Sequence, residues 1–495
     1  MFPLKQKRSG LPSTGGTQRV LCPFPDIFVY LGMKRRTMKI PFSLIEKYNV
    51  PVPRYTSYPP ANFFDAGFGT GDYLRAVEQS NHEKPENISI YIHIPFCTQL
   101  CLYCGCNTHI TKNTDLMQAY VHALQKEISM ISPLIDHNRK VSQIHWGGGT
   151  PNALPAEHIG RVMHLLKSEF RFIDHPEIAV ECNPAHLDEE YIGKLAAMGF
   201  NRISLGVQDF QEKVLHAVKR EVPAIPVAEL CDMIRSHPGM SVNLDFIYGL
   251  PYQSAGLFAE TIDRAIKIAP DRLVTFSYAH VPWVKKAQKK LEEYGLPSAE
   301  EKVKMFENAW ERMNGAGYIP IGLDHYARPE DDLAKALNSR SLHRNFQGYC
   351  TRETTGQVYA FGVTGISQLE NVYAQNSRTV KEYIRATEGG EIRIEKGYAL
   401  SYTEKVVREV INEIMCNHYL SWKQIAERFE TGPEDIKALL NFDNRKLEPF
   451  RDDHLLEYSD DDLVICDTGR FFLRNIAAVF DIHIGDLSRK YSKSV

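Results

Sequence analysis

Between residues 88 and about 330, short segments with apolar residues at every second position alternate with longer segments of helical spacing. The first pattern is typical of strands, and apolar residues three or four positions apart are typical of helices that bury one face. Strands that alternate with helices form parallel sheets. We therefore expect an α/β fold whose parallel sheet is open or curled into a partial (β/α)6 TIM-like barrel. The six predicted strands are 88–94, 141–146, 177–183, 202–208, 242–250 and 272–281.

The pattern outside these strands divides the chain into four predicted regions. Residues 1–37 are basic and lack periodicity, which predicts a disordered or over-annotated extension, with the functional chain beginning near Met38. Residues 38–87 are predicted to form an N-terminal arm over the site, and residues 88–384 the barrel. Residues 385–495 contain helical patterns and a predicted hairpin, an order that also fits a winged helix. Their excess of acidic side chains opposes binding to a phosphate backbone, so we expect a mostly helical covering domain.

Composition excludes some classes of protein. The chain has 495 residues, of which 43% are apolar and 24% charged, and its formal net charge is −3. These values are ordinary for a globular protein and give no reason to expect nucleic acid as a partner. No segment approaches the roughly 18 consecutive apolar residues of a membrane span. Six of the ten cysteines are scattered along the chain, which favours a reducing compartment, and we expect a cytoplasmic monomer.

The other four cysteines lie within ten positions, directly after the first predicted strand. Such a loop could form a zinc site, a disulfide knot, a redox pair or the cradle of an iron–sulfur cluster. Structural zinc sites usually take their ligands from two separated pairs, and no second pair of close cysteines or histidines lies nearby. Three closely spaced thiolates can instead hold three corners of a four-iron, four-sulfur cluster and leave one iron open to a small chelating molecule. We favour this interpretation for Cys97, Cys101 and Cys104.

The surroundings of this loop resemble the radical S-adenosylmethionine superfamily. The Cys-x3-Cys-x2-Cys loop follows the first strand, and a GGGTP segment at 147–151 follows the second. The resemblance implies that Cys97, Cys101 and Cys104 hold one [4Fe-4S] cluster and that S-adenosylmethionine chelates the open iron. Electron transfer would then cleave the sulfonium and form a deoxyadenosyl radical, which takes hydrogen from unactivated carbon. The glycines would let the backbone approach the methionine end of this cofactor closely.

A longer series of motifs is similar to the family of oxygen-independent coproporphyrinogen III oxidases. The resemblance implies oxidative decarboxylation of two propionates of coproporphyrinogen III to give protoporphyrinogen IX in porphyrin (haem) biosynthesis. A radical mechanism suits this substrate because the hydrogen on the propionate β-carbon is not acidic enough for a side-chain base. The resemblance also implies a reductant such as flavodoxin or ferredoxin and an electron acceptor that the sequence does not identify. The motifs occur in the family's order and are PRYTSYPPANFF, YIHIPFC, CGC, HWGGGTP, GVQDF, VKRE, DFIYGLP, YAHVP and HRNFQGY.

The same resemblance implies cofactor-binding positions for two molecules of S-adenosylmethionine. Carboxylates among them can accept hydrogen bonds from ribose hydroxyls or an amino group, and an arginine can bind a carboxylate through two bonds. Taken alone, each position also fits an ordinary structural role. The positions for the cluster-bound molecule are Tyr91, Gly148, Glu181 and Ile366, and those for the second are Tyr103, Gly149, Thr150, Gln208, Arg220, Asp245 and Ala279.

The fourth cysteine of the loop, Cys106, belongs to the CGC motif. The resemblance implies that it is functionally important without ligating iron, so we treat it as the candidate catalytic residue. Packing beneath the loop is the alternative role. Further candidates lie outside the barrel motifs, because a tetracarboxylate needs cations and an arm could close over the site. They are His325, His343 and Arg344 for substrate carboxylates, and Arg54 and Tyr55 for an N-terminal flap.

Two other functions are known for related radical proteins. Haem-carrying relatives share the barrel and three cysteines, but they typically lack the CGC cysteine and the PRYTSYP and HRNFQGY segments. Haem-degrading radical methyltransferases also differ at the fourth cysteine. The CGC cysteine and the PRYTSYP and HRNFQGY segments are all present in this chain, so the sequence favours the oxidase.

Overall fold

Six strands of the central sheet pair in parallel in the order of the chain, as the sequence predicts. The computed structural model describes residues 38–352, 357–485 and 491–494, and the predicted extension at 1–37 lies outside the described residues. β1 is buried along almost its whole length, as expected for a parallel strand that is covered on both faces. The six strands are β1 (Ile88–Ile94), β4 (Lys140–Gly148), β5 (Arg171–Cys182), β6 (Arg202–Gln208), β7 (Ser241–Tyr248) and β8 (Arg272–Ser277).

Further strands extend this sheet at both ends. A seventh parallel strand, β13, pairs with β1 although the two are far apart in the sequence. β14, β15 and β16 continue from β13 in antiparallel pairs, and β10 and β9 continue from β8 in the same way. β16 belongs to the central sheet although it follows the predicted boundary at residue 385. The added strands are β13 (Val358–Phe361), β14 (Ile366–Gln368), β15 (Val372–Asn376), β16 (Ile394–Ala399), β10 (His325–Ala327) and β9 (Ile319–Ile321).

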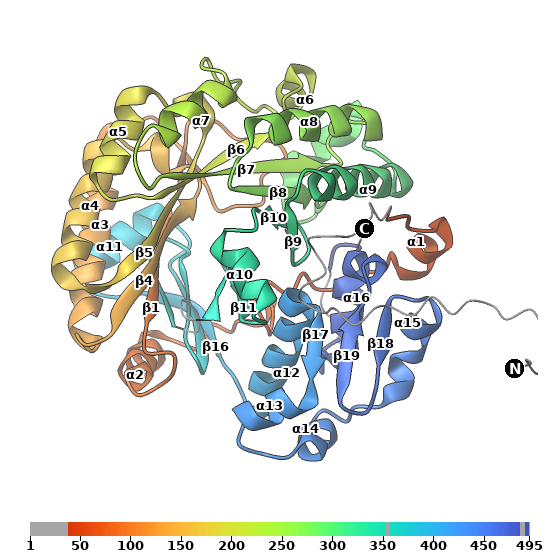
Figure 1. The fold of residues 1–495 in the computed structure, drawn as a ribbon. Coiled ribbons are helices and arrows are strands. Elements are labelled where there is room, and N and C mark those ends of the chain that lie inside the picture. Colours follow the sequence, from red (N-terminus) through yellow and green to blue (C-terminus); the bar gives the residue numbers. More distant parts are fainter. Residues whose placement is uncertain (1–37, 353–356, 486–490, 495) are drawn as a thin grey trace, which may run out of the picture. The chain divides into compact units, whose positions relative to one another are not determined.

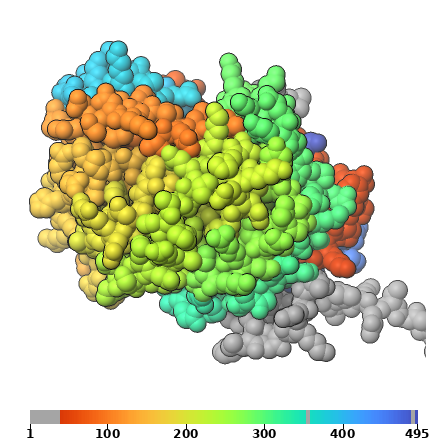
Figure 2. All heavy atoms as spheres, turned by 90° about the horizontal axis from the view of Figure 1, so that it is seen from above, coloured from red at the N-terminus to blue at the C-terminus, as the bar shows by residue number. Residues whose placement is uncertain are grey.

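Helices follow the parallel strands and cover the outer face of the sheet (Figure 1). Their first residues are set by polar caps: the Asn113 side chain accepts hydrogen bonds from the first turn of α3 (Thr114–Ile131), and Asp188 does so for α5 (Glu189–Ala197). Figure 2 shows this layer from above, with α11 (Val380–Glu388), in cyan, beside α3, in orange, and residues of these two helices are in contact. The other helices of the layer are α4 (Ala156–Glu169), α6 (Glu212–Ala217), α7 (Val227–Arg235), α8 (Ala255–Ile268) and α9 (Ala299–Gly315).

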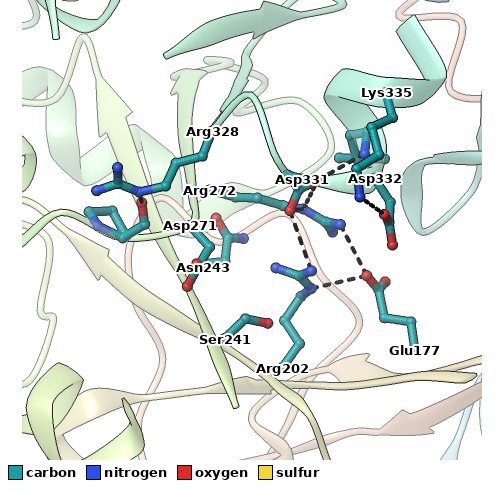
Figure 3. A network of polar contacts seen from close by, with 12 residues as sticks. Glu177, Arg202, Ser241, Asn243, Asp271, Arg272, Arg328, Asp331, Asp332 and Lys335 are labelled. Atoms are coloured by element: carbon teal, nitrogen blue, oxygen red, sulfur yellow. Dashed lines mark hydrogen bonds and ion pairs between the residues drawn. The ribbon is translucent and has the colours of Figure 1, made fainter. Parts of the chain in front are cut away.

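A partly buried ion-pair network joins the strands near their amino ends (Figure 3). Glu177 of β5 accepts from the guanidinium groups of Arg202 and Arg272, the first residues of β6 and β8, over 3.0 and 3.1 Å. Arg272 also donates to Asp331 over 2.9 Å. Burial raises the pKa of Glu177, but the two arginines outweigh burial and hold its pKa well below the usual range. The network therefore neutralises the charges at the end of the sheet opposite to the predicted site.

The C-terminal region consists of short helices and a three-stranded sheet. β18 and β19 form the predicted hairpin, and β17 pairs with the other edge of β19. α1 (Phe42–Tyr48) of the N-terminal arm packs on this region, where the Tyr48 ring stacks on Phe450 with centroids 5.0 Å apart. The elements are α12 (Tyr402–Asn412), α13 (Trp422–Arg428), α14 (Pro433–Leu439), α15 (Glu448–Asp452), α16 (Leu473–Ala477), β17 (Tyr419–Ser421), β18 (Leu456–Tyr458) and β19 (Asp462–Ile465).

Four further elements connect these regions. β11 and β12 form an antiparallel hairpin beside the central sheet. The connecting elements are α2 (Thr70–Ser80), α10 (Asp332–Asn338), β11 (Leu342–Asn345) and β12 (Gly348–Thr351).

Within the part of the chain that the structure describes, no helix combines the length and the apolar character needed to cross a bilayer.

Candidate functional site

The four clustered cysteines lie in one loop whose two ends are held together. β1 leads into β2 (Phe96–Cys97), which pairs with β3 (His109–Ile110) and closes the loop at its base. The N–H of Leu102 donates to the carbonyl oxygen of Val218 over 2.9 Å and fixes the middle of the loop. The loop borders a cavity of about 320 Å³ at the carboxyl ends of the strands, where ligands gather in parallel α/β sheets. The thiols of Cys97, Cys101, Cys104 and Cys106 are free, and all four line this cofactor cavity.

The glycine segment after β4 lies directly against the cysteine loop. The N–H of Gly149 donates to the carbonyl oxygen of Ile94 over 2.7 Å, and the hydroxyl of Thr150 lies 3.3 Å from the Cys97 thiol. A Cβ atom on Gly149 would come within 2.6 Å of the Pro95 carbonyl oxygen. The glycine is therefore required where the two loops touch, in addition to the room that it leaves for a cofactor.

Two predicted carboxylates face the same cavity from β5 and β7, the strands on either side of β6. Glu181, near the end of β5, lies 2.9 Å from Nε2 of His145 and, despite burial, raises the pKa of that imidazole. Asp245 of β7 accepts from the Ser204 hydroxyl over 2.9 Å. Burial raises the pKa of Asp245 to about 6. Both groups can accept hydrogen bonds from hydroxyl or amino groups of a ligand in the cavity.

The VKRE motif brings a cation and a carboxylate to the cysteine loop. Arg220 directs one guanidinium nitrogen at the Cys101 sulfur, 4.0 Å away. Glu221 accepts from the Thr98 hydroxyl over 3.1 Å and from Nδ2 of Asn183 over 2.8 Å. Arg220 thus places positive charge beside the thiols, and Glu221 ties the first turn of the loop to the end of β5.

The structure brings most of the predicted cofactor positions together. Three of them lie elsewhere: Tyr91 stacks on His145 outside the cavity lining, Ile366 packs against the apolar cluster of Phe64, and Ala279 lines a neighbouring cavity. Those that line the cofactor cavity are Tyr103, Gly148, Gly149, Thr150, Glu181, Gln208, Arg220 and Asp245.

The donor set of this cavity fits an iron–sulfur cluster. Soft thiolates are the usual ligands of such clusters, and here three of them come from one short loop beside a positively charged arginine. Over the described ranges, no three Cys, His, Asp or Glu side chains are grouped closely enough to ligate a single metal ion. The three thiols line one cavity, as ligands of a cluster would.

A second, larger cavity of about 560 Å³ adjoins the first, and Phe276 lines both. Its walls come from the N-terminal arm, the carboxyl ends of β7 and β8, α9, β11, the region of α16 and the last described residues. Five Lys or Arg side chains line this cation-lined cavity, together with one carboxylate, Asp324: they are Lys493, near the end of the chain, and the four basic residues Arg54, Lys302, Arg344 and Arg474.

The structure places the candidates for substrate binding (His325, His343 and Arg344) and those for the flap (Arg54 and Tyr55) in several different places. Arg54 and Arg344 line the cation-lined cavity, whereas His325 lines a small cavity next to it. His343 is buried in a different place, where its Nε2 lies 3.2 Å from Nδ2 of Asn412. The Tyr55 hydroxyl donates to Asp481 over 2.9 Å and holds the arm to the C-terminal region. Lys302, Arg474 and Phe276 were not singled out from the sequence, since none of the three lies within a motif.

The comparisons with known proteins agree with this geometry. Residues 91–265 match the family described as the radical SAM superfamily. The chain is 40% identical over 455 residues to the oxygen-independent coproporphyrinogen III oxidase of Synechocystis sp. and covers 97% of that protein. It is 38% identical to the Escherichia coli protein of the same name, covering 96% of it. The solved structure of coproporphyrinogen III oxidase from Escherichia coli, described as a radical SAM enzyme, matches 90% of this chain with a TM-score of 0.82 and 35% identity. The chain therefore belongs to the family of oxygen-independent coproporphyrinogen III oxidases.

Proposed function

We propose that this chain converts coproporphyrinogen III to protoporphyrinogen IX without oxygen in porphyrin biosynthesis. The observation that carries the proposal is the 40% identity to a protein named for this activity, over 97% of that protein. Two propionates react, and each loses carbon dioxide, one hydrogen atom and one electron to become a vinyl group. The reaction is an oxidation, so the chain acts as an oxidoreductase.

The roles of the chain's own residues are to bind and to orient. Cys97, Cys101 and Cys104 would hold the [4Fe-4S] cluster. When bound, the cluster and S-adenosylmethionine supply a carbon radical that takes hydrogen from an unactivated carbon. Glu181 and Asp245 would accept hydrogen bonds from the cofactor, which fits their positions on the cavity wall.

The remaining predicted positions form the rest of the proposed cofactor site. Arg220 would bind a cofactor carboxylate, and the backbone of Gly148, Gly149 and Thr150 would lie along the cofactor. Cys106 would act on the substrate or the second S-adenosylmethionine. Tyr91 and Ile366 would support the cluster-bound molecule, and Tyr103, Gln208 and Ala279 would contact the second.

The regions and partners follow from the same proposal. Residues 38–87 would act as an arm over the site, which is supported by Pro51, Arg54 and Thr56 in the lining of the cation-lined cavity. The C-terminal region would cover that cavity, since Phe471 and Arg474 also line it. We propose a cytoplasmic monomer that receives electrons from flavodoxin or ferredoxin and passes substrate electrons to a separate acceptor.

An anaerobic conversion assay tests the proposed function. Reconstituted protein, coproporphyrinogen III, S-adenosylmethionine and a reductant should yield protoporphyrinogen IX, and product should be absent when S-adenosylmethionine is omitted. Unchanged substrate in the presence of a full cluster would contradict the proposal. Anaerobic mixing with haem addresses the carrier alternative, because a carrier should bind haem stoichiometrically and an oxidase has no need to do so.

A further inference from the structure

The cation-lined cavity carries more positive than negative charge. Apart from Lys493, its basic side chains are the four residues Arg54, Lys302, Arg344 and Arg474, and its carboxylate, Asp324, is bonded to Nδ1 of its neighbour His325 over 2.7 Å. Among the residues that the structure describes, none of the four cations forms an ion pair. Cations that are gathered in one cavity are normally balanced by anions, so this cavity is suited to a ligand that supplies negative charge.

Arg474 is distinguished from the other three by its hydrogen bonds. Its guanidinium donates to the carbonyl oxygens of Val52 and Pro53 in the arm and to those of Ser492, Lys493 and Ser494 at the other end of the chain. These bonds occupy its donors and hold the two segments together. Arg474 is therefore a positioning residue that contributes charge to the cavity but no free donor.

The other three cations keep free donors. Nε and Nη1 of Arg344 have no partner in the described structure, and its guanidinium lies over the Tyr349 ring, 5.0 Å from the centroid. Arg54 donates through one nitrogen to the Ser277 carbonyl oxygen over 3.3 Å and is otherwise exposed to the cavity. Lys302 makes one long bond of 3.4 Å to the Tyr278 carbonyl oxygen.

The pKa values of Lys302 and Arg54 are both lowered. Burial, and then the charges of Arg54 and Arg474, lower the pKa of Lys302 to about 8. Burial likewise lowers the pKa of Arg54, although Asp324 partly opposes it. Carboxylates bound to these groups would remove the repulsion and form charge-assisted hydrogen bonds.

The cation-lined cavity adjoins the cofactor cavity and has apolar walls as well as cations. Phe276 lines both cavities, so a ligand in the cation-lined cavity can direct one edge toward the cofactor site. Trp283 and Phe306 supply flat apolar surface in the same cavity, as a tetrapyrrole requires.

We propose that Arg54, Lys302 and Arg344 bind the propionates of the substrate that are not reacting, and so direct a reacting propionate past Phe276 toward the cofactor cavity. This inference rests on the proposed function for the identity of the ligand. It assigns the substrate carboxylates to three side chains that come from the arm, α9 and β11. It also makes these side chains the determinants of selectivity for porphyrinogens with four carboxylates over those with two.

Binding of stable porphyrins to the reconstituted full chain tests this inference without turnover. The affinities for coproporphyrin III, with four propionates, and mesoporphyrin IX, with two, are measured by fluorescence titration. The natural chain should bind coproporphyrin III more tightly than mesoporphyrin IX. Lys302→Gln and Arg344→Gln should each weaken the binding of coproporphyrin III roughly tenfold or more and weaken the binding of mesoporphyrin IX less. Lys304→Gln is the matched control, since Lys304 lies on the same helix, is exposed and pairs with Glu300.

Two different results would each overturn the inference. Equal losses for both porphyrins in the Lys302 and Arg344 variants would indicate a packing effect and overturn the inference. Weaker S-adenosylmethionine binding with unchanged porphyrin binding would assign the cations to the cofactor and overturn it as well. Unchanged iron content and thermal midpoint establish that the variants are folded. Failure of the proposed function would appear separately, as carboxylate-dependent binding of coproporphyrin III without conversion of coproporphyrinogen III.

Discussion

The N–H of Gly149 donates a 2.7 Å hydrogen bond to the carbonyl oxygen of Ile94. This bond joins the glycine segment after β4 to the end of β1, directly before the cysteine loop. A Cβ atom at position 149 would lie 2.6 Å from the Pro95 carbonyl oxygen, which is backbone and cannot move aside cheaply. The geometry of the loop that carries the thiols thus depends on a residue some fifty positions later in the chain.

Gly149→Ala should displace the cysteine loop and reduce the iron content after reconstitution by more than half, because the added methyl group overlaps the Pro95 carbonyl. Iron and sulfide analysis, with the cluster absorption, measures the effect. Gly256→Ala is the control, since its Cβ would meet only the Ser254 hydroxyl at 4.0 Å in α8. Full iron content in Gly149→Ala would show that the loop does not depend on this contact.

Substitutions in the cysteine loop should separate its four thiols. Cys97→Ala, Cys101→Ala or Cys104→Ala should each abolish the four-iron signal, because three thiolates are the minimum set for the cluster. Cys106→Ser should retain iron and spectrum but convert coproporphyrinogen III far more slowly, because serine lacks the soft, oxidisable sulfur. Cluster loss in Cys106→Ser would make Cys106 a ligand or a support of the loop, and full activity would leave it a packing role.

Glu177→Gln should destabilise the fold without touching the cofactor cavity. The change leaves Arg202 and Arg272 with only Asp331 as a counter-charge, and breaking a partly buried network of this kind costs up to roughly 3–5 kcal/mol. The midpoint of denaturant unfolding measures this loss of stability. Glu190→Gln removes an exposed ion pair with Lys194 on α5 and should change the midpoint far less. Similar midpoints for the two variants would contradict the importance of the network.

Binding of coproporphyrin III should weaken as the pH rises from about 7 to 9. Lys302 carries its charge below its pKa of about 8 and loses it above, and the charged groups that face it are Arg54 and Arg474. The propionates stay ionised over this range, so the lost ammonium is the group that changes. A bound carboxylate raises the pKa of Lys302, which moves the loss of affinity to somewhat higher pH. Fluorescence titration at several pH values should show the slope in the natural chain and a flatter profile in Lys302→Gln; equal slopes would contradict this role.

The sequence predicts the parallel sheet well because its strands carry a clear local pattern. Segments such as ISIYIHI alternate without interruption, and each of the six predicted strands is present. β13 was not predicted, because its four residues are too short for periodicity and its partner β1 is far away in the chain. The resemblance to a family identified most of the residues that line the cofactor cavity, because these residues lie within contiguous motifs.

The cation-lined cavity illustrates what a single sequence does not reveal. Lys302 lies on α9 and Arg474 on α16, and neither has a local pattern that separates it from a solvated surface cation. His343 is the opposite case: it belongs to a family motif, yet it lies against Asn412, away from this cavity. Only the packing of the arm, α9, β11 and the C-terminal region brings the four cations together.

Transfer of deuterium from the substrate tests the central claim most directly. Coproporphyrinogen III labelled at the propionate β-carbons is incubated anaerobically with the reconstituted protein, S-adenosylmethionine and reductant, and the 5′-deoxyadenosine formed is analysed by mass spectrometry. We predict that it carries deuterium and accumulates together with protoporphyrinogen IX, because hydrogen is taken from the β-carbon by a radical derived from the cofactor. Protoporphyrinogen IX formed alongside unlabelled 5′-deoxyadenosine, or with none, would contradict this account.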